Sequence, residues 1–248
     1  MTTAAANGTA ALEFREVSYT IGGNLILDKL SVRIAEGRTL VLLGRSGSGK
    51  TTALKMLNGL LFPTTGDVLV DQRATTQWNL IDLRRSIGYV IQEVGLFPHF
   101  TIGENVALVP RLKGWPQDRI ASRVAELLDQ VGLEPAQFLD RYPRQLSGGQ
   151  RQRVGVARAL AAEPKLLLFD EPFGALDPVT RVELQDQFLA LRDRLKKTSI
   201  FVTHDVREAL RLGTEIALLH RGRLEVLATP DEFVKSSGPE ARAFLATL

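Results

Sequence analysis

The sequence predicts an α/β protein with a largely parallel β-sheet, and three observations lead to this fold class. Apolar segments of strand length recur along the 248 residues, and most are followed by a segment with helical spacing of its apolar residues. A Gly-rich loop joins one of these apolar segments to a helix. A long helical stretch interrupts the alternation in the middle of the chain, which indicates an insertion within a single domain.

The composition is that of a protein with an ordinary hydrophobic core. The formal net charge is only +3 and no block of Lys or Arg occurs, so we expect no nucleic-acid partner. The absence of cysteine excludes disulfides and zinc–thiolate sites. The longest apolar runs, TLVLLG and KLLLF, are far shorter than the roughly 18 residues needed to span a bilayer.

The first part of the chain is predicted to be rich in strands. Residues 1–10 have neither a basic start nor an apolar centre, so we expect a flexible lead and not a signal peptide. Residues 11–21 and 30–37 alternate apolar and polar side chains, which predicts strands with one solvated face. Residues 39–43 are continuously apolar, which is typical of a strand buried on both faces. The next elements are a helix and two strands, at 53–61, 66–72 and 86–92.

The middle of the chain, from about Glu93 to Ala161, is predicted to be helical. Its apolar residues recur at spacings of three and four, and Gly132 lies where a helix should stop. We therefore expect one domain, 11–248, in which a helical subdomain of about 93–161 is inserted into a core of 11–92 and 162–248. The later elements are strands at 165–169, 199–203, 215–220 and 222–228, a helix at 178–195, and a short helix after 203.

The stretch GRSGSGKT, residues 44–51, fits the phosphate-binding pattern G-x-x-x-x-G-K-[ST] and lies between a buried strand and a helix. Glycines allow backbone N–H groups to converge on phosphate oxygens, and the helix N-terminus adds the positive end of its dipole. We therefore expect Lys50 to reach the β- and γ-phosphates of a nucleotide and the Thr51 hydroxyl to bind Mg²⁺. A flexible loop before an ordinary helix is the disfavoured alternative. The other residues expected to bind the nucleotide here are Gly44, Arg45, Ser46, Gly47, Ser48, Gly49 and Thr52.

The apolar strand KLLLF ends in two carboxylates, Asp170 and Glu171. Ligands collect at the carboxyl ends of strands in a parallel sheet. We expect Asp170 to hold Mg²⁺ through water and Glu171 to act as a general base on the attacking water. A solvated acidic loop end would explain this pair if it stood alone, but the phosphate-binding loop favours the chemical role.

A helix predicted at about 148–161 begins with Ser147, Gly148, Gly149 and Gln150, which have the anatomy of an anion site. A helix of this length, about 20 Å, would place Ser147 roughly that far from the chain's own phosphate site. We therefore expect these residues to complete the site of a second copy, in a head-to-tail dimer with the nucleotide at the seam. A plain capped helix is the alternative, and two adjacent glycines in its first turn disfavour it.

On these motifs, nearly the whole chain resembles the ATP-binding subunit of an ABC transporter. GRSGSGKTT matches the Walker A motif, LSGGQ the signature motif and LLLFDE the Walker B motif. GALD matches the D-loop, VTHD the switch region and VIQ the Q-loop. The resemblance implies an ABC-type P-loop NTPase fold with an N-terminal antiparallel β part and a helical subdomain, and it implies ATP and Mg²⁺ as ligands.

The resemblance also implies roles for residues outside the first three motifs. Tyr19 would stack on adenine, although a half-buried strand aromatic is the alternative. Gln92 would contact Mg²⁺ and the attacking water, His204 would contact the γ-phosphate, and Asp177 would act at the seam. The remaining histidines, His99 and His220, are expected to be surface or core residues.

The function implied by the resemblance is ATP hydrolysis that powers transport. Such a subunit would lie peripherally at the cytoplasmic face of the cell membrane, with integral-membrane permease subunits and a solute-binding protein as partners. Import is favoured because exporters of this family usually fuse the domain to membrane helices. Two other classes are disfavoured: a soluble ABC ATPase acting on nucleic acid would carry tandem domains or a coiled coil, and a non-hydrolysing scaffold would lack Glu171 or His204.

Residues 84–115 resemble the ATP-binding subunits of importers for glycine betaine, choline or carnitine, and import of an amino acid or another small solute is the alternative. Within this stretch, we expect Phe97, Pro98 and Phe100 to form a small apolar docking surface for a permease helix. A buried turn is the alternative for these residues.

Overall fold

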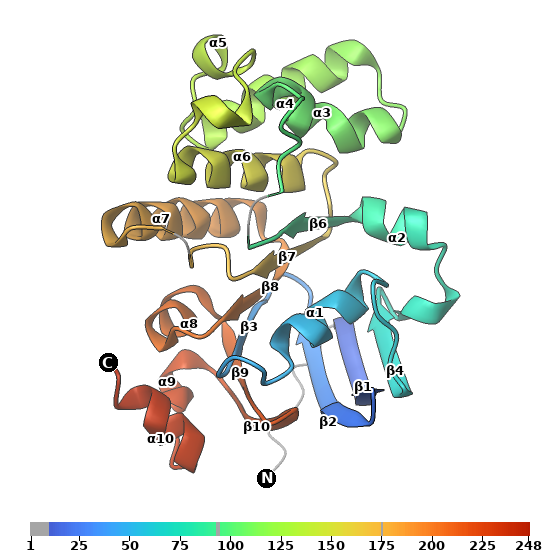
Figure 1. Ribbon diagram of the computed structural model, residues 1–248, viewed down its shortest axis with the longest axis vertical. Helices are drawn as coiled ribbons and strands as arrows, with labels where there is room; N and C mark the ends of the chain where they lie inside the picture. The colour runs from blue at the N-terminus through green and yellow to red at the C-terminus, as the bar shows by residue number, and fades with distance from the viewer. Residues whose placement is uncertain (1–9, 93–94, 175) are drawn as a thin grey trace. The chain divides into compact units, whose positions relative to one another are not determined.

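The computed structural model describes residues 10–92, 95–174 and 176–248. Contacts divide the chain into two units, one up to Leu83 together with Lys196–Leu248 and the other over Arg84–Leu195. Both units combine helices and strands (Figure 1), so the predicted α/β class is confirmed. Residues 1–9 of the expected lead lie outside the described residues. Ala10, which was assigned to the lead, instead pairs with Ala35 as the first residue of a strand.

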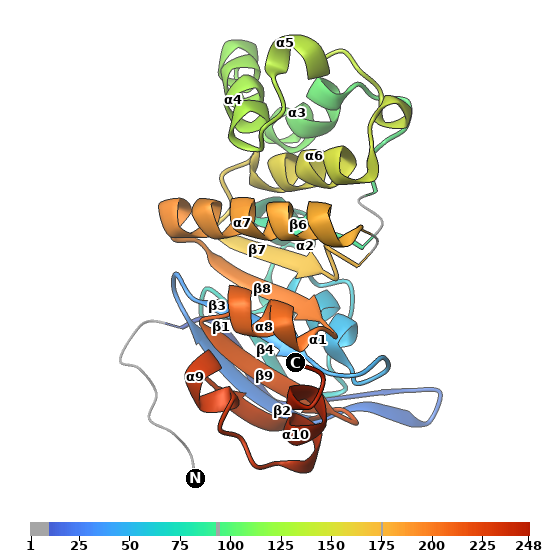
Figure 2. The same cartoon turned by 90° about the vertical axis from the view of Figure 1, so that its left-hand side faces the viewer.

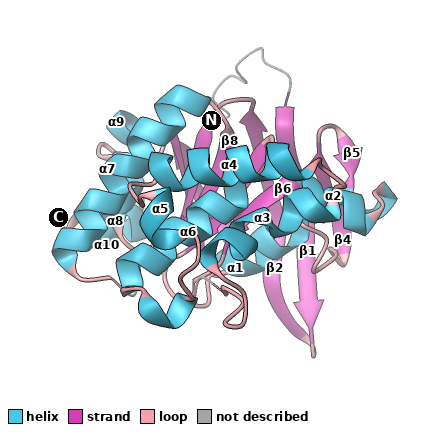
Figure 3. Cartoon of the chain, turned by 90° about the horizontal axis from the view of Figure 1, so that it is seen from above, coloured by secondary structure: helices cyan, strands magenta, loops and turns pink. Residues whose placement is uncertain are grey.

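The first unit contains an antiparallel sheet with the strand order β2-β1-β4-β5. Figure 3 shows β1, β2 and β4 side by side. The turn between β1 and β2 is made by Gly22 and Gly23, whose φ angles of 55° and 80° favour glycine. The predicted strand 30–37 is therefore the second part of a longer strand. Its bounds and those of its neighbours are β1 Ala10–Ile21, β2 Asn24–Ala35, β4 Thr65–Val70 and β5 Arg73–Ala74.

The strand predicted at 66–72 ends earlier than expected. Asp71 and Gln72 have φ angles of 48° and 62°, so they form the turn that leads into β5. Polar residues at the end of a strand pattern are compatible with either strand or turn. Here the antiparallel pairing of Val70 with Arg73 shows that Asp71 and Gln72 form the turn between β4 and β5.

The second sheet of the first unit contains β3 (Thr39–Leu43), β8 (Thr198–Thr203), β9 (Glu215–His220) and β10 (Arg223–Ala228). β3 pairs in parallel with β8 on one side and with β9 on the other. Leu43 is opposite Thr203 and Leu218, so β3 and β8 end at the same level and β9 continues two residues further. This edge is where a parallel sheet binds ligands.

The helices of the first unit include α8, the short helix expected after residue 203, and α1, which was predicted at 53–61 but begins at Lys50 and ends at Leu57. The C-terminal helices α9 and α10 and the short helix α2 were not predicted. α9 begins with a capping box between Thr229 and Glu232, and Asn79 accepts hydrogen bonds from the first turn of α2. The bounds are α1 Lys50–Leu57, α2 Leu80–Ser86, α8 Val206–Leu212, α9 Pro230–Phe233 and α10 Pro239–Leu245, with a 3₁₀ turn at Thr75–Gln77.

The second unit has two parallel strands, β6 (Ile87–Val90) and β7 (Leu166–Asp170), and a set of helices. Figure 2 shows α3, α4 and α5 on one side of α6, and α7 with β7 on the other. A methyl group on Gly88 of β6 would clash with the carbonyl oxygen of Ala159, so α6 packs directly on the strand. The helices are α3 Ile102–Leu112, α4 Gln117–Gln130, α5 Pro135–Phe138, α6 Gly148–Leu160 and α7 Pro178–Leu195, with a 3₁₀ turn at Pro143–Gln145.

The helix predictions for this unit are confirmed. α7 has the predicted bounds, and α6 ends one residue before the predicted Ala161, which is its C-cap. Gly132 follows the cap of α4 with a φ of 71°, the left-handed conformation in which helices commonly end. Across the described residues, no helix combines the length and the apolar character needed to cross a membrane.

Candidate functional site

The loop that joins β3 to α1 is shaped by close backbone approaches. Gly49, with a φ of 99°, is the N-cap of α1, and a Cβ on it would lie 2.6 Å from Cδ2 of Leu27 on β2. A Cβ on Gly44 would clash with the carbonyl oxygen of Leu219 at the end of β9. These glycines are required because the loop rests directly on neighbouring strands, which leaves its backbone N–H groups in a fixed arrangement.

Lys50 and Ser48 supply the chemistry of this loop. Lys50 is buried, and its Nζ donates hydrogen bonds to the carbonyl oxygens of Gly44 and Arg45 at 2.7 and 2.8 Å. Within the described part of the chain, the buried Ser48 Oγ has no hydrogen-bond partner. Residues 44–52 include no acidic side chain. An ammonium, an unsatisfied hydroxyl and a helix N-terminus at one place fit an anionic ligand such as a phosphate chain.

Tyr19 lies near this loop in the first unit. It is half-buried on β1 and lies opposite Leu27 of β2 in the strand register. Leu27 is the residue that packs against the position of Gly49. The fold therefore brings the predicted adenine-stacking residue to the neighbourhood of the phosphate-binding loop.

His204 follows β8 directly and is exposed. Because Leu43 pairs with Thr203, the next residues on the two strands, Gly44 and His204, leave the sheet side by side. The turn that carries His204 is fixed by Thr203, whose Oγ1 donates to Glu208 Oε2 at 2.6 Å. The same Oγ1 accepts the N–H of Asp205 at 3.0 Å. His204 thus stands at the edge of the sheet from which the phosphate-binding loop starts.

The two carboxylates of the second unit have different surroundings. Asp170 is buried as the last residue of β7, and the hydroxyl of Tyr89 on β6 donates to its Oδ2 at 3.4 Å. Burial, followed by the charge of Asp170, raises the pKa of Tyr89, so the phenol remains a donor. Glu171 is half-buried with a φ of 45°, an uncommon conformation for a residue other than glycine. The chain therefore turns sharply at the residue predicted to be the general base.

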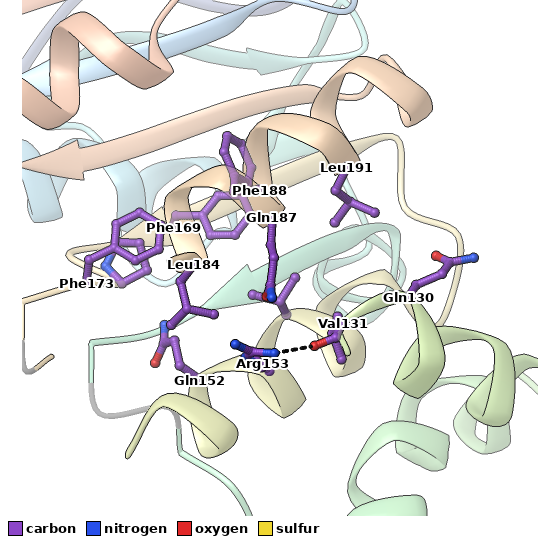
Figure 4. Close-up of a pocket in the computed structure, with 12 residues that line it drawn as sticks. Gln130, Val131, Gln152, Arg153, Phe169, Phe173, Leu184, Gln187, Phe188 and Leu191 are labelled. Atoms are coloured by element: carbon purple, nitrogen blue, oxygen red, sulfur yellow. Dashed lines mark hydrogen bonds between the residues drawn. The ribbon is translucent and has the colours of Figure 1, made fainter. Parts of the chain in front are cut away.

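Aromatic side chains hold this turn in place. Phe169 packs edge to face against Phe188 of α7, with ring centroids 5.3 Å apart and an interplanar angle of 76°. Figure 4 shows Phe169, Phe173 and Phe188 around a pocket between α6 and α7, with Leu184 beside them. Phe169 and Phe173 stand on either side of the carboxylates in the sequence, so the loop that carries Asp170 and Glu171 is anchored at both ends.

The LSGGQ stretch forms a capping box at the start of α6. Ser147 Oγ accepts the Gln150 N–H at 3.2 Å, and Gln150 Oε1 accepts the Ser147 N–H at 2.9 Å. A Cβ on Gly149 would lie 2.6 Å from Cγ2 of Thr180, so this glycine allows α6 to approach α7. Ser147 and Gly148 are exposed. The helix start is therefore both rigid and available to a ligand.

The path of α6 corrects one step of the sequence argument. Its C-terminal end packs on Gly88, which pairs with Leu167 near the start of β7. Its N-terminal end packs on Leu176 and Thr180, which follow β7. α6 therefore runs antiparallel to β7, and its length does not carry its first residues away from the carboxyl end of that strand. The assignment of LSGGQ to a partner's site must rest on other grounds.

Asp177 and Gln92 complete the predicted set. Asp177 Oδ1 accepts the Thr180 N–H at 3.0 Å and thereby caps α7. Hydrogen bonds from Thr180 lower the pKa of Asp177, so this exposed side chain carries a negative charge. Gln92 is exposed two residues after the end of β6. Tyr19, the phosphate-binding loop and His204 belong to the first unit, whereas Gln92, Asp170, Glu171, the LSGGQ stretch and Asp177 belong to the second.

Two sets of residues near these motifs were not found from the sequence. Glu240 on α10 pairs with Arg45, and no local pattern could reveal a contact across 195 positions. His220, expected to be an ordinary surface or core residue, lies 3.4 Å from Glu240. Asn105 is fully buried and organises the loop before α3. The sequence gives only a weak signal for this role, namely an asparagine among the regularly spaced apolar residues of the predicted helix.

A strand, a glycine-rich loop and a helix in this order, at the edge of a parallel sheet, define the P-loop NTPase class predicted from the sequence. A family model described as "ABC transporter" matches residues 27–174, more than half of the chain. The chain therefore belongs to the ABC transporter family.

Curated relatives support the same family. The chain is 50% identical over 214 residues to the osmoprotectant import ATP-binding protein OsmV of Salmonella typhimurium, covering 86% of this chain and 56% of the relative. It is 46% identical to the glycine betaine uptake system ATP-binding protein YehX of Escherichia coli, covering 88% and 71%. It is 43% identical to the sulfate/thiosulfate import ATP-binding protein CysA of Thermosynechococcus vestitus, covering 89% and 65%. The chain thus spans little more than half the length of OsmV.

Solved structures agree with the fold. The cbiO1 protein of Clostridium perfringens, part of an ABC transporter complex, has a TM-score of 0.84 at 29% identity and covers 92% of each chain. A dimeric ATP-binding cassette in a post-hydrolysis state, bound to ADP and Pi, has a TM-score of 0.79 at 34% identity. That comparison covers 88% of this chain and 98% of the cassette.

Proposed function

We propose that this chain is the ATP-hydrolysing subunit of an ABC importer, active as a head-to-tail dimer. The observation that carries the proposal is the loop in which the buried Lys50 is held by the carbonyls of Gly44 and Arg45 beside the unpartnered Ser48 Oγ. This loop offers cationic and hydrogen-bonding groups that a triphosphate can satisfy in place of the present contacts.

The chain's own residues have separate tasks in the reaction. Lys50 exchanges its two carbonyl contacts for oxygens of the β- and γ-phosphates, and the backbone of residues 44–49 holds the phosphate chain. Glu171 accepts a proton from the attacking water, and His204 and Gln92 orient the γ-phosphate and that water. Tyr19 stacks on the adenine ring. The positive φ of Glu171 supports its role, because strained backbone is concentrated at active sites.

Mg²⁺ is the metal that these residues suit. The Thr51 hydroxyl, the Asp170 carboxylate and the Gln92 amide oxygen are hard oxygen ligands, which Mg²⁺ prefers. When bound, the ion neutralises charge on the phosphate oxygens during transfer. Asp170 stays in place for this task because β7 buries it and Tyr89 donates a hydrogen bond to it.

We assign the LSGGQ residues of each copy to the nucleotide site of the other copy, so a complete site requires a dimer. The exposed Ser147 and Gly148 at the start of α6 form an anion site, and Asp177 stands at the start of α7, which packs against Gly149. The dimeric cassette bound to ADP and Pi supports this arrangement, since this chain covers 98% of it. ATP would close the dimer and hydrolysis would reopen it. The γ-phosphate would thus shift the equilibrium between the open and closed dimer toward the closed state.

We assign the permease-docking surface to residues of the second unit. Phe97 and Pro98 are exposed and Phe100 is half-buried, and the rings of Phe97 and Phe100 lie 5.3 Å apart. Phe97 also lines a groove between the end of α2, β6, α3 and α6, with a volume of about 320 Å³. An exposed aromatic next to a groove supports docking of a helix end from a membrane subunit.

The solute that we propose is a quaternary-amine osmoprotectant such as glycine betaine, choline or carnitine. The names of OsmV and YehX support this class, and a solute-binding protein would deliver the solute to the permease. Inorganic-anion import is the second candidate, because CysA is 43% identical to the chain. The subunit would then lie at the cytoplasmic face of the membrane through its permease.

Glu171→Gln tests the ATPase proposal. The variant should bind ATP with unchanged affinity, hydrolyse it at least about a hundredfold more slowly because the base is lost, and form a stable dimer with Mg·ATP. Light scattering reads the dimer, and the wild-type chain with ATP serves as the control. A variant that binds ATP but remains monomeric at saturation would refute the seam, and unchanged hydrolysis would refute the role of Glu171.

The solute is tested by reconstituting the chain in vesicles with its permease and its solute-binding protein. Glycine betaine, choline or carnitine should stimulate ATP hydrolysis and accumulate inside, whereas sulfate should do neither. Stimulation by sulfate alone would favour the second candidate and leave the ATPase proposal intact.

A further inference from the structure

A charge cluster within the first unit joins the C-terminal helix α10 to the phosphate-binding loop. Glu240 on α10 is buried, and Arg45 of the loop donates from Nε to its Oε1 at 2.5 Å and from Nη2 to its Oε2 at 3.4 Å. His220 Nδ1, at the end of β9, lies 3.4 Å from the same Oε2. The Glu240 N–H donates to Glu225 Oε1 on β10 at 3.1 Å. Glu240 therefore links α10 to the phosphate-binding loop and β9 through its carboxylate, and to β10 through its backbone N–H.

Arg45 also contacts the phosphate-binding lysine. Its side chain holds Glu240, while its carbonyl oxygen accepts a hydrogen bond from Lys50 Nζ at 2.8 Å. The other side of the loop rests on the β9–β10 turn, where the Gly222 N–H donates to the Ser48 carbonyl at 3.3 Å. A shift of α10 therefore reaches Lys50 through a single residue.

The ion pair differs from an ordinary surface contact. The Arg45 side chain is 66% exposed, but the Glu240 side chain is only 10% exposed. A carboxylate that has lost most of its water depends on its cation, so removing Arg45 leaves a poorly solvated negative charge beside the loop. The hydrogen bond from Arg45 lowers the pKa of Glu240, which keeps this carboxylate ionised at neutral pH.

We propose that Glu240 is a positioning residue for the nucleotide site, and that α10 and nucleotide binding are coupled through Arg45. The inference rests on the proposed binding of ATP. A triphosphate draws Lys50 Nζ away from the carbonyl of Arg45, which frees that peptide to move and changes the pair with Glu240. Because such coupling is reciprocal, a partner or chain segment that displaces α10 changes the affinity for nucleotide by the same factor.

A double-mutant cycle on the full chain tests the coupling, with calorimetry of Mg·AMP-PNP binding as the readout. Glu240→Gln should weaken binding about three- to tenfold, the scale of re-ordering one loop residue. Arg45→Gln should weaken it further, because the charge of Glu240 then opposes the phosphates. Combining the two should bring the affinity back toward that of Glu240→Gln alone, and Arg45→Lys should keep it within about threefold of wild type.

The matched control is Arg15→Gln. Arg15 on β1 pairs with Glu13 at 2.7 Å in the same unit, with side-chain exposures of 56% and 25%. This variant should leave the affinity unchanged. Thermal denaturation of every variant shows whether it is folded, and the hydrogen exchange of the wild type tests the coupling where a variant is not.

Hydrogen exchange supplies a second readout. Mg·AMP-PNP should change the exchange of amides in α10 at least about threefold in the wild type and not in Glu240→Gln. Affinities of both single variants within twofold of wild type, or additive effects in the double variant, would overturn the coupling. A wild-type chain that does not bind Mg·AMP-PNP would instead refute the proposed function.

Discussion

Asn105 offers a test of how the docking surface is held together. Its side chain is fully buried at the start of α3, where Oδ1 accepts the Phe97 N–H at 2.8 Å. Its Nδ2 donates to the carbonyl oxygens of Phe97, Phe100 and Thr101 at 3.1, 3.2 and 2.9 Å. One amide thus fixes both ends of the turn that exposes Phe97 and Pro98.

The cost of Asn105→Ala follows from these contacts. An NH₂ group has two protons, so the three acceptors share two strong bonds, and the carbonyl adds a third. At about 1 kcal/mol net for each bond, the second unit should lose about 3 kcal/mol of its free energy of unfolding. With a slope of about 2 kcal/mol per molar urea, the midpoint should fall by about 1.5 M.

Tryptophan fluorescence can isolate this unit. Trp115 lies just after α3, with the Arg119 guanidinium 3.6 Å from its ring centroid, and Trp78 belongs to the first unit. In a Trp78→Phe background, Trp115 therefore reports the unfolding of the second unit alone. Asn79→Ala is the control: the exposed Asn79 caps α2 in the first unit, so this variant should leave the unfolding midpoint reported by Trp115 unchanged.

We expect Asn105→Ala to affect the stimulation of ATP hydrolysis by the permease more than hydrolysis by the chain alone. We propose this turn as the permease-docking surface, and the side-chain hydrogen bonds of Asn105 among the described residues all go to residues 97–101. Asn105→Ala should therefore lower permease-stimulated ATP hydrolysis at least about fivefold and basal hydrolysis by less than twofold. A loss of stability below 0.5 kcal/mol, as for an ordinary surface change, would refute the energetic reasoning. An equal loss of basal and stimulated activity would refute the docking role.

Three further predictions follow from other sites. Mixing the Lys50→Ala and Ser147→Arg variants should give more ATPase activity than either variant alone. In a mixed dimer one nucleotide site contains both substitutions and the other contains neither. Full activity of Ser147→Arg alone would contradict the shared site. Gly88→Ala should destabilise the second unit by about 3 kcal/mol in the Trp115 urea assay, since the added methyl meets the carbonyl of Ala159. The lowered pKa of Glu240 contributes stability that is fully present above its ordinary value of 4.5 and is lost as the pH falls through the folded value. Urea titrations should therefore show the advantage of wild type over Glu240→Gln shrinking with acidification, and a constant difference from pH 7 to 3 would contradict this.

The sequence by itself determined the features that depend on neighbours along the chain. Hydrophobic periodicity located α3, α4, α6 and α7 and the buried strands, because each pattern repeats within one element. The phosphate-binding loop and the capped start of α6 were also readable, since their glycines and Ser147 act on backbone groups a few residues away. The family resemblance rested on these same short motifs, and the family match confirms it.

The tertiary structure decided what depends on residues far apart in the chain. The antiparallel path of α6 beside β7 brings the start of α6 to the carboxyl end of that strand, which helix length alone could not reveal, because packing sets where a helix begins in space. The pair of Arg45 with Glu240 joins positions 195 residues apart. The spacing of apolar residues carries no information about such pairs, because a charged residue fits an exposed position of the pattern whether or not it has a distant partner. Only the folded chain brings β9, the phosphate-binding loop and α10 together.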